Sequence, residues 1–386
     1  MTATENYSNI IDNIFGSGTT TFNTKNDVYN HVIGALNNPS DYYDFKTNFI
    51  ERLQRIKNIY ASNPLFLKDI IVQVNEIESE KNWEGAFAEL AAYDYLNQRL
   101  MNLETSIYKP IKPNVTLGKT KTFALELGGS AANLDGFIKD LSLYFDVKCF
   151  KANVTDILEG IYKELKLHFG RTDFHISAEY ALDISYEDFQ EKRNKLLQEL
   201  KSSITPSKTT FFNSLIMPNL SYRILWIAGI QTAERTYNAF SHAENFHRLL
   251  FKYANKFVKK KPTIIVLVVF PWYNSVVTNF TNDNCKFYRA LSRRVFCQYK
   301  HDKAKFKTFN SKFTGRHTIH KVSNYLSGII FLEDNTICSK VHDDTNVKSY
   351  IYLNPNAVNP VAKSLSIEFI LGLNYTDFDD FDYDNY

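Results

Sequence analysis

Apolar positions in the first eighty residues recur at helical spacing, three and four residues apart. They fall into three groups: Val28, Val32, Ile33 and Leu36, then Phe49, Leu53, Ile56 and Ile59, then Phe66, Ile70, Ile71 and Val74. One apolar face per segment is typical of helices that pack on one another. The pattern predicts an N-terminal helical region over residues 1–80, either a structural layer or a target-recognition module. Residues 1–25, polar and interrupted by Gly16 and Gly18, are expected to be a loose segment.

From residue 107 onward, short runs of β-branched and aromatic residues predict strands. The runs are residues 107–115, 122–127, 134–139, 142–150, 222–230, 264–270, 327–333 and 349–353. Helical spacing returns in residues 82–100, 155–169, the second half of 173–208, and 231–258. The run 264–270 is continuously apolar, which is typical of a strand covered by helices on both faces of a sheet. Alternating strands and helices predict an α/β fold.

Residues 133–150 have the pattern of a β-hairpin. Two strand-like runs flank a two-residue connection, Asp140-Leu141. If that connection is the turn, Asp135 lies opposite Asp146, and the alternation of a strand puts Asp146 and Lys148 on the same face. The hairpin would then bring two carboxylates and one ammonium group together.

Two close carboxylates repel each other unless a cation lies between them, and a hard divalent ion such as Mg²⁺ is the natural choice. A nearby lysine can orient or deprotonate a water, or neutralise charge on a phosphate. The alternative is a solvent-facing hairpin with ordinary surface charges. Leu143, Phe145 and Val147 would fill the opposite face, but Tyr144 and Phe150 share the charged one. We therefore expect the charged face to be partly buried.

Asp135, followed eleven residues later by Asp146-Val147-Lys148, resembles the signature of the PD-(D/E)xK, or restriction-endonuclease-like, nuclease superfamily. The resemblance covers residues 80–275, although Asn133-Leu134 stands where the name-giving proline would be. It implies a mixed sheet flanked by helices and an endonuclease dependent on Mg²⁺ or Mn²⁺ that cuts DNA. It also implies that Asp135 and Asp146 bind the metal and that Lys148 is catalytic. By analogy, such enzymes serve in restriction, anti-phage defence, repair or transposition.

The same superfamily opens its core with a helix whose glutamate completes the metal site, often a few residues after a glycine. Gly85 and Glu89 in the predicted helix 82–100 match that element. Glu89 is therefore the third expected metal ligand and a catalytic residue. Glu84, on a different face of the helix, is the alternative, and either glutamate could instead be a solvated surface charge.

The formal net charge of the chain is only +3, but its distribution is uneven. Residues 285–321 contain one acid, Asp302, and eleven basic residues: Lys286, Arg289, Arg293, Arg294, Lys300, Lys303, Lys305, Lys307, Lys312, Arg316 and Lys321. Interleaved aromatic rings make this a candidate nucleic-acid interface. We expect Arg289, Arg293, Arg294, Lys300, Lys303 and Lys305 to contact DNA. A solvated basic surface is the alternative.

The remaining features bound the organisation and the environment. Four cysteines without a C-x-x-C pair argue against a zinc ribbon and a disulfide framework. No signal-peptide pattern opens the sequence, and the longest apolar run is too short for a bilayer, so we expect a cytoplasmic protein without membrane contact. The predicted parts are a helical region (1–80), a nuclease-like core (81–275) with a helical insertion near 173–208, a basic C-terminal α/β part (276–375) and an acidic tail (376–386).

The expected partners are DNA, other proteins of a defence or repair system, and a second copy of the chain. Two rival functions remain: a DNA-binding protein with an inactive nuclease-like core, and a nuclease directed at RNA. Composition and spacing do not separate them.

Overall fold

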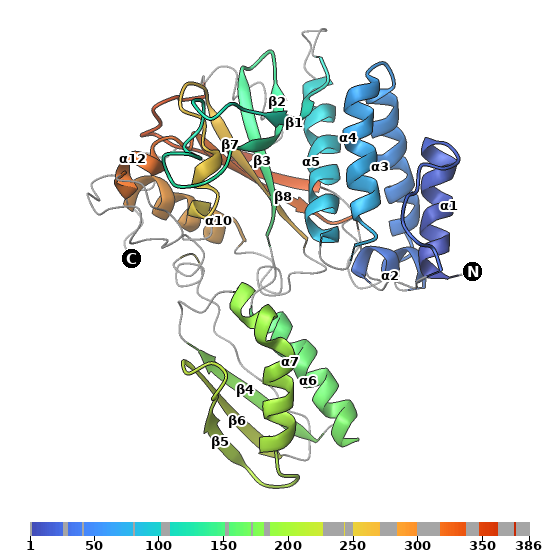
Figure 1. The fold of residues 1–386 in the computed structure, drawn as a ribbon, viewed down its shortest axis with the longest axis vertical. Helices are drawn as coiled ribbons and strands as arrows, with labels where there is room; N and C mark the ends of the chain where they lie inside the picture. The colour runs from blue at the N-terminus through green and yellow to red at the C-terminus, as the bar shows by residue number, and fades with distance from the viewer. Residues whose placement is uncertain are drawn as a thin grey trace. The chain divides into compact units, whose positions relative to one another are not determined.

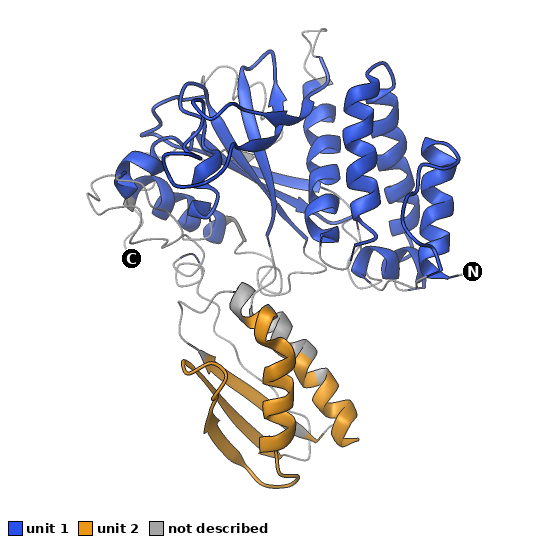
Figure 2. Ribbon diagram, viewed as in Figure 1, with its two compact units in different colours: residues 1–151, 239–386 blue, residues 152–238 orange. Residues whose placement is uncertain are grey.

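A computed structural model of the chain describes residues 2–25, 30–40, 42–79, 82–101, 109–150, 154–170, 173–180, 186–226, 243, 250–270, 284–298, 317–336, 347–361 and 374–375. The chain divides into two compact units (Figure 2). The larger comprises Met1–Lys151 and Ala239–Tyr386, and the smaller, Ala152–Asn238, is inserted between these two segments. The insertion expected near 173–208 lies within the smaller unit.

Within the described residues of the larger unit, seven strands form one mixed sheet in the order β1-β2-β3-β7-β8-β9-β10 (Figure 1). Their bounds are β1 Lys112–Thr116, β2 Asn133–Ile138, β3 Leu143–Cys149, β7 Thr263–Val269, β8 Gly328–Asp334, β9 Val347–Leu353 and β10 Asn374–Tyr375. The three central strands, β3, β7 and β8, are parallel, and β7 is buried along its whole length. The mixed α/β class and this buried strand confirm the expectation from the apolar pattern.

Five N-terminal helices build the layers beside the sheet: α1 Ala3–Phe15, α2 His31–Asn37, α3 Phe45–Tyr60, α4 Pro64–Glu76 and α5 Trp83–Met101. α5 packs on β3 and β7, and α3 and α4 pack on α5 (Figure 1). The helical region was predicted, but the prediction of a loose segment over residues 1–25 was wrong for Ala3–Phe15, which form α1. Thr2 and Glu5 form a capping box at the start of α1. That box and the buried apolar face of α1 stabilise the helix.

Helices cover both faces of the sheet, as the neighbouring residues Ser349 and Tyr350 of β9 demonstrate. Successive side chains of a strand point to opposite faces. Ser349 hydrogen-bonds to Tyr95 of α5, whereas the ring of Tyr350 lies 5.4 Å from that of Tyr288. Tyr288 belongs to α10 (Asn284–Arg293), which continues into the π-helical turn η2 (Arg294–Gln298).

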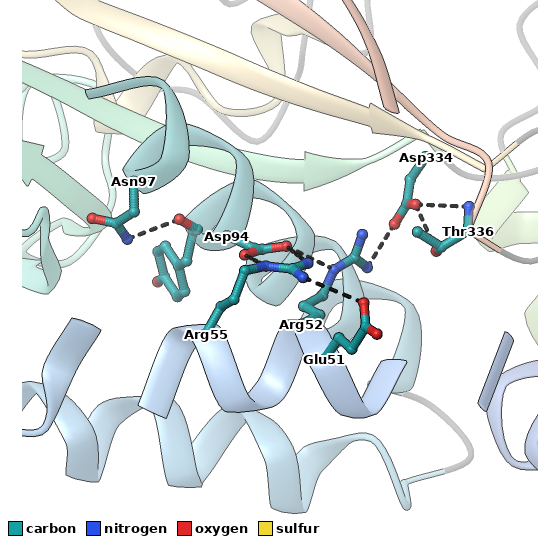
Figure 3. Close-up of polar contacts among 8 residues, drawn as sticks. Glu51, Arg52, Arg55, Asp94, Asn97, Asp334 and Thr336 are labelled. Atoms are coloured by element: carbon teal, nitrogen blue, oxygen red, sulfur yellow. Dashed lines mark hydrogen bonds and ion pairs between the residues drawn. The ribbon is translucent and has the colours of Figure 1, made fainter. Parts of the chain in front are cut away.

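A buried ion network joins the helical layers to the end of β8 (Figure 3). Arg52 of α3 donates to Asp334 Oδ2 at 2.8 Å, and its Nε lies 3.4 Å from Asp94 Oδ2 on α5. Arg55 makes two further hydrogen bonds to Asp94, at 3.0 and 2.8 Å. Burial would raise the pKa of Asp334, but the positive charge of Arg52 outweighs burial and lowers it. Because each buried charge is paired, the network holds α3, α5 and β8 in place.

Two predicted elements in this unit differ from the structure. Residues 122–127 are not a strand: Thr122 makes one isolated bridge to Val258, and turns follow it. The helix expected over 231–258 lies largely outside the described residues, but it does not continue to residue 258. A 3₁₀ turn, η1 (Ala254–Lys256), ends in the extended residue Phe257. The chain therefore turns back toward the sheet earlier than helical spacing predicted.

The smaller unit is a two-layer α/β structure with a core of its own. Helices α6 (Val154–Phe169) and α7 (Tyr186–Ser203) pack together beside an antiparallel sheet in the order β4-β6-β5. The strands are β4 Phe174–Tyr180, β5 Thr210–Asn213 and β6 Leu220–Trp226. Buried residues from both layers, including Ile161, Leu200 and Tyr222, form one cluster.

Candidate active site at the β2–β3 hairpin

The hairpin has the predicted register. Gly136 pairs with Phe145 and Ile138 pairs with Leu143, which is the alignment that sets Asp135 opposite Asp146. The Ser142 N–H donates to the Lys139 carbonyl at 3.0 Å and closes the turn around Asp140-Leu141. Ser142, the last residue of this turn, adopts a positive φ of 48°.

Packing against α5 sets the position of the hairpin. The ring of Phe145 lies over Gly136, where a Cβ atom would be 2.0 Å from the ring Cζ. Only glycine leaves room for that ring. On α5, Tyr93 packs edge-on against Phe145 with ring centroids 6.3 Å apart. The Tyr93 hydroxyl also donates to the Asp135 carbonyl at 2.9 Å, so α5 and β2 are joined next to the candidate site.

Asp135 lies at the open end of the hairpin, beyond the Gly136–Phe145 pair. Its side-chain Oδ2 accepts the backbone N–H of Val147 at 2.6 Å. The residue is 8% exposed. This hydrogen bond fixes the carboxylate between the two strands, next to the side chain of Lys148.

Asp146 holds one lysine on each carboxylate oxygen. Lys148 Nζ lies 2.7 Å from Oδ2, and Lys256 Nζ donates to Oδ1 at 2.7 Å. The Asp146 side chain is only 2% exposed, so both contacts are made away from water. Burial would raise the pKa of Asp146, but the two lysines outweigh burial and lower it. Asp146 is therefore ionised.

Lys148 occupies the place between the two aspartates where the sequence predicted a cation. Its Nζ lies 3.5 Å from Asp135 Oδ2, in addition to the contact with Asp146. It donates to the Val147 carbonyl at 2.7 Å and lies 4.9 Å from the centroid of the Tyr253 ring. Burial would lower the pKa of Lys148, but Asp146 and Asp135 outweigh burial and raise it. The lysine therefore carries its charge in this arrangement.

Glu89 reaches the same cluster from α5. Its Oε2 lies 3.2 Å from the Tyr93 hydroxyl, which also donates to the Asp135 carbonyl. Burial, and then the charge of Asp135, raise the pKa of Glu89 to about 8. Burial, and then the charge of Asp146, raise the pKa of Asp135 to about 6. The Tyr93 hydroxyl donates to Glu89, and this hydrogen bond lowers the pKa of Glu89 but does not outweigh burial.

The structure thus brings together the four residues that were predicted to share a site: Asp135, Asp146, Lys148 and Glu89. Glu84 is buried on the same helix, five residues earlier and about 140° around its axis from Glu89. Lys256 is the residue that sequence reasoning missed. It belongs to a segment interpreted as a continuing helix, and only the turn at η1 brings it to Asp146.

The donor set suits a hard cation, because carboxylate oxygens are the ligands that Mg²⁺ and Mn²⁺ prefer. In this conformation, however, the described residues include no group of three or more His, Cys, Asp or Glu side chains arranged to hold a metal ion. Lys148 and Lys256 neutralise Asp146 instead. The residue types therefore fit the ion, and the two lysines compete with it for the same oxygens.

The predicted nucleic-acid residues are only partly described. Arg289 and Arg293 on α10 and Arg294 in η2 are half-buried, beside the buried side chains with which this segment packs on the sheet. Lys300, Lys303 and Lys305 lie outside the described residues, as does the acidic tail, residues 376–386. Their contact with DNA stays a prediction.

No protein-family model, curated protein or solved structure matches this chain. The superfamily resemblance consequently stays a prediction from the motif residues. Across the part of the chain that the structure describes, every helix is too short or too polar to cross a membrane.

Proposed function

We propose that this chain is a divalent-metal-dependent nuclease that hydrolyses phosphodiester bonds of DNA, with a restriction-endonuclease-like core. One observation carries the proposal: two carboxylates and a lysine of the β2–β3 hairpin converge with a glutamate of α5 in one buried cluster. Three secondary-structure elements contribute residues to the cluster: β2 contributes Asp135, β3 contributes Asp146 and Lys148, and α5 contributes Glu89. Ordinary surface charges would not be held out of water in this way.

In this proposal Asp135, Asp146 and Glu89 hold Mg²⁺ or Mn²⁺. When bound, the ion supplies a Lewis acid that activates water and neutralises charge on the phosphodiester. Asp135 needs little rearrangement, because its hydrogen bond from Val147 already fixes the carboxylate. Glu89 must release its proton to bind the ion, since its pKa is raised to about 8.

Lys148 is assigned to charge neutralisation rather than to proton abstraction. Its pKa is raised by Asp146 and Asp135, so it remains an ammonium group at neutral pH. An ammonium group cannot accept a proton, but it stabilises negative charge that develops on the reacting phosphate. Substitution of Lys148 by alanine should therefore slow cleavage while Asp135 and Asp146 still bind the metal.

The test is a digestion panel with the intact protein. Plasmid DNA, single-stranded DNA and RNA are incubated with Mg²⁺, Mn²⁺ or EDTA, and the variant Asp146→Asn is compared with Asp140→Asn. Asp140 is an exposed aspartate in the turn of the same hairpin, so it controls for the loss of one charge. We expect metal-dependent cutting of DNA that Asp146→Asn removes and Asp140→Asn keeps. Equal activity of the two variants would exclude the site.

A DNA-binding protein with an inactive core is the second candidate function. Lysines contact both oxygens of Asp146, and a binding protein without a metal could keep that arrangement permanently. Such a protein would bind the DNA of the panel without cutting it in the presence of either metal. An RNA-directed nuclease would cut only the RNA substrate.

A further inference from the structure

Lys256 makes the most exposed of the charged contacts at Asp146. The Lys256 side chain is 26% exposed, whereas the side chains of Lys148 and Asp146 are 16% and 2% exposed. Lys148 is enclosed by Asp135, Asp146 and the Tyr253 ring. Of the two lysines, Lys256 is thus the one that solvent, and a dissolved ligand, can reach.

The charges of the hairpin cluster are balanced without a metal. Asp135 and Asp146 supply two negative charges, and Lys148 and Lys256 supply two positive charges, all within the contacts given above. A divalent ion added to this set would lie against two ammonium groups in a buried place, where like charges repel strongly. Even when Glu89 ionises to bind the ion, a lysine still contacts each oxygen of Asp146, so binding of the ion there requires that a lysine leave or that further negative charge arrive.

A nucleic-acid phosphate can supply that negative charge and receive the lysine. Lys256 begins a segment with four lysines in six residues, the others being Lys259, Lys260 and Lys261. Lys260 and Lys261 are exposed. Such a segment attracts a polyanion, and an ammonium group pairs readily with a phosphate oxygen. The phosphate groups of the proposed nucleic-acid substrate can thus draw Lys256 away from Asp146.

We propose that Lys256 is a positioning residue that occupies Asp146 Oδ1 in the free protein and moves to a substrate phosphate when nucleic acid binds. The inference rests on the proposed function, because it takes Asp146 to be a metal ligand. Its consequence is positive coupling: nucleic acid frees Asp146 for the divalent ion. By thermodynamic linkage, the ion must raise the affinity for nucleic acid by the same factor.

The coupling is measured by titrating Mn²⁺ calorimetrically into the intact protein, with and without a hydrolysis-resistant phosphorothioate DNA duplex. For the wild type we expect the duplex to tighten Mn²⁺ binding roughly tenfold or more, within the usual range of coupling between sites. Fluorescence anisotropy of the labelled duplex should show the same factor when Mn²⁺ is added. If the duplex leaves the Mn²⁺ affinity of the wild type unchanged, the proposal is overturned without the use of any variant.

Variants assign the coupling to Lys256. Lys256→Gln should bind Mn²⁺ roughly tenfold more tightly than the wild type in the absence of DNA, and the duplex should add little further. Lys208→Gln removes the same charge from an exposed position of the smaller unit and should behave as the wild type. Wild-type coupling in Lys256→Gln would overturn the role of this residue.

Asp146→Asn separates the two proposals. If this variant loses the Mn²⁺ site and Lys256→Gln still matches the wild type, the metal site stands and only the role of Lys256 fails. If no Mn²⁺ binding depends on Asp146, with or without the duplex, both proposals fail.

Discussion

The ring of Phe145 lies directly over Gly136, its partner across the β2–β3 ladder. A Cβ atom at Gly136 would be 2.0 Å from Cζ of that ring, far closer than side-chain atoms approach. We therefore expect Gly136→Ala to destabilise the protein by on the order of 3 kcal/mol, because the buried ring must leave its position. Urea denaturation measures the loss.

A smaller side chain in place of Phe145 should relieve this clash. In the double variant Gly136→Ala with Phe145→Leu, the loss in unfolding free energy should be smaller than the sum of the two single losses. Additive losses would show that the ring does not set the requirement for glycine.

Glu89 should make the metal-free protein less stable as the pH rises. Its pKa is raised from 4.5 to about 8, so the folded chain holds a proton there that the unfolded chain releases. The contribution of this bound proton to the free energy of unfolding is fully present below about pH 4.5. It is lost as the pH rises toward 8, at up to about 1.4 kcal/mol per pH unit. Urea unfolding in EDTA at several pH values between these limits measures the slope.

Glu89→Gln isolates this contribution. Asp135, with its pKa raised to about 6, adds a slope of the same sign in both proteins. The variant should therefore show a shallower decline of stability with pH than the wild type. Identical slopes would mean that Glu89 is ionised in the folded protein at neutral pH.

Local sequence patterns predicted the hairpin that carries the site, but they could not predict the contacts that the site makes with distant parts of the chain. The turn at Asp140-Leu141 and strand alternation are properties of a few neighbouring residues, so they predicted the register that brings Asp135 and Asp146 together. Lys256 contacts Asp146 from 110 residues away, and no local pattern specifies that contact. Helix α1 could have been found, because Thr2 and Glu5 have capping-box spacing before an apolar face.

Arg52 should contribute far more to stability than Arg55, although both contact Asp94. Arg52 is buried and pairs with Asp334, whose side chain is fully buried. Arg52→Leu leaves that carboxylate without its guanidinium group and should cost about 3–5 kcal/mol. Arg55, 43% exposed, should cost about 1 kcal/mol or less when changed to leucine. Thermal and urea unfolding test the difference, and equal losses would contradict it.

Arg293 and Arg294 test the predicted nucleic-acid interface. If each neutralises one DNA phosphate, Arg293→Gln with Arg294→Gln should reduce the slope of log affinity against log salt by about two. Anisotropy titrations in EDTA at several salt concentrations give the slope. Lys195→Gln with Lys208→Gln removes the same charge from exposed positions of the smaller unit and serves as the control. An unchanged slope in the arginine variant would leave this segment as solvated surface.

Asp146→Asn should separate catalysis from stability and binding. Cleavage should fall by several orders of magnitude, because the variant lacks the carboxylate proposed to bind the ion. The structure adds a cost that the sequence did not predict. Lys148 and Lys256 lose their shared counter-charge, so the metal-free variant should be less stable by about 3 kcal/mol.

DNA affinity in EDTA should be retained or increased in Asp146→Asn, because a negative charge is removed while both lysines remain. Single-turnover cleavage, urea unfolding and anisotropy give the three quantities on one preparation, with Asp140→Asn as the matched control. If Asp146→Asn loses cleavage only in proportion to the fraction unfolded, Asp146 is a structural counter-ion and not a metal ligand. If it is folded, binds DNA and does not cut, the carboxylate itself is required for the chemistry.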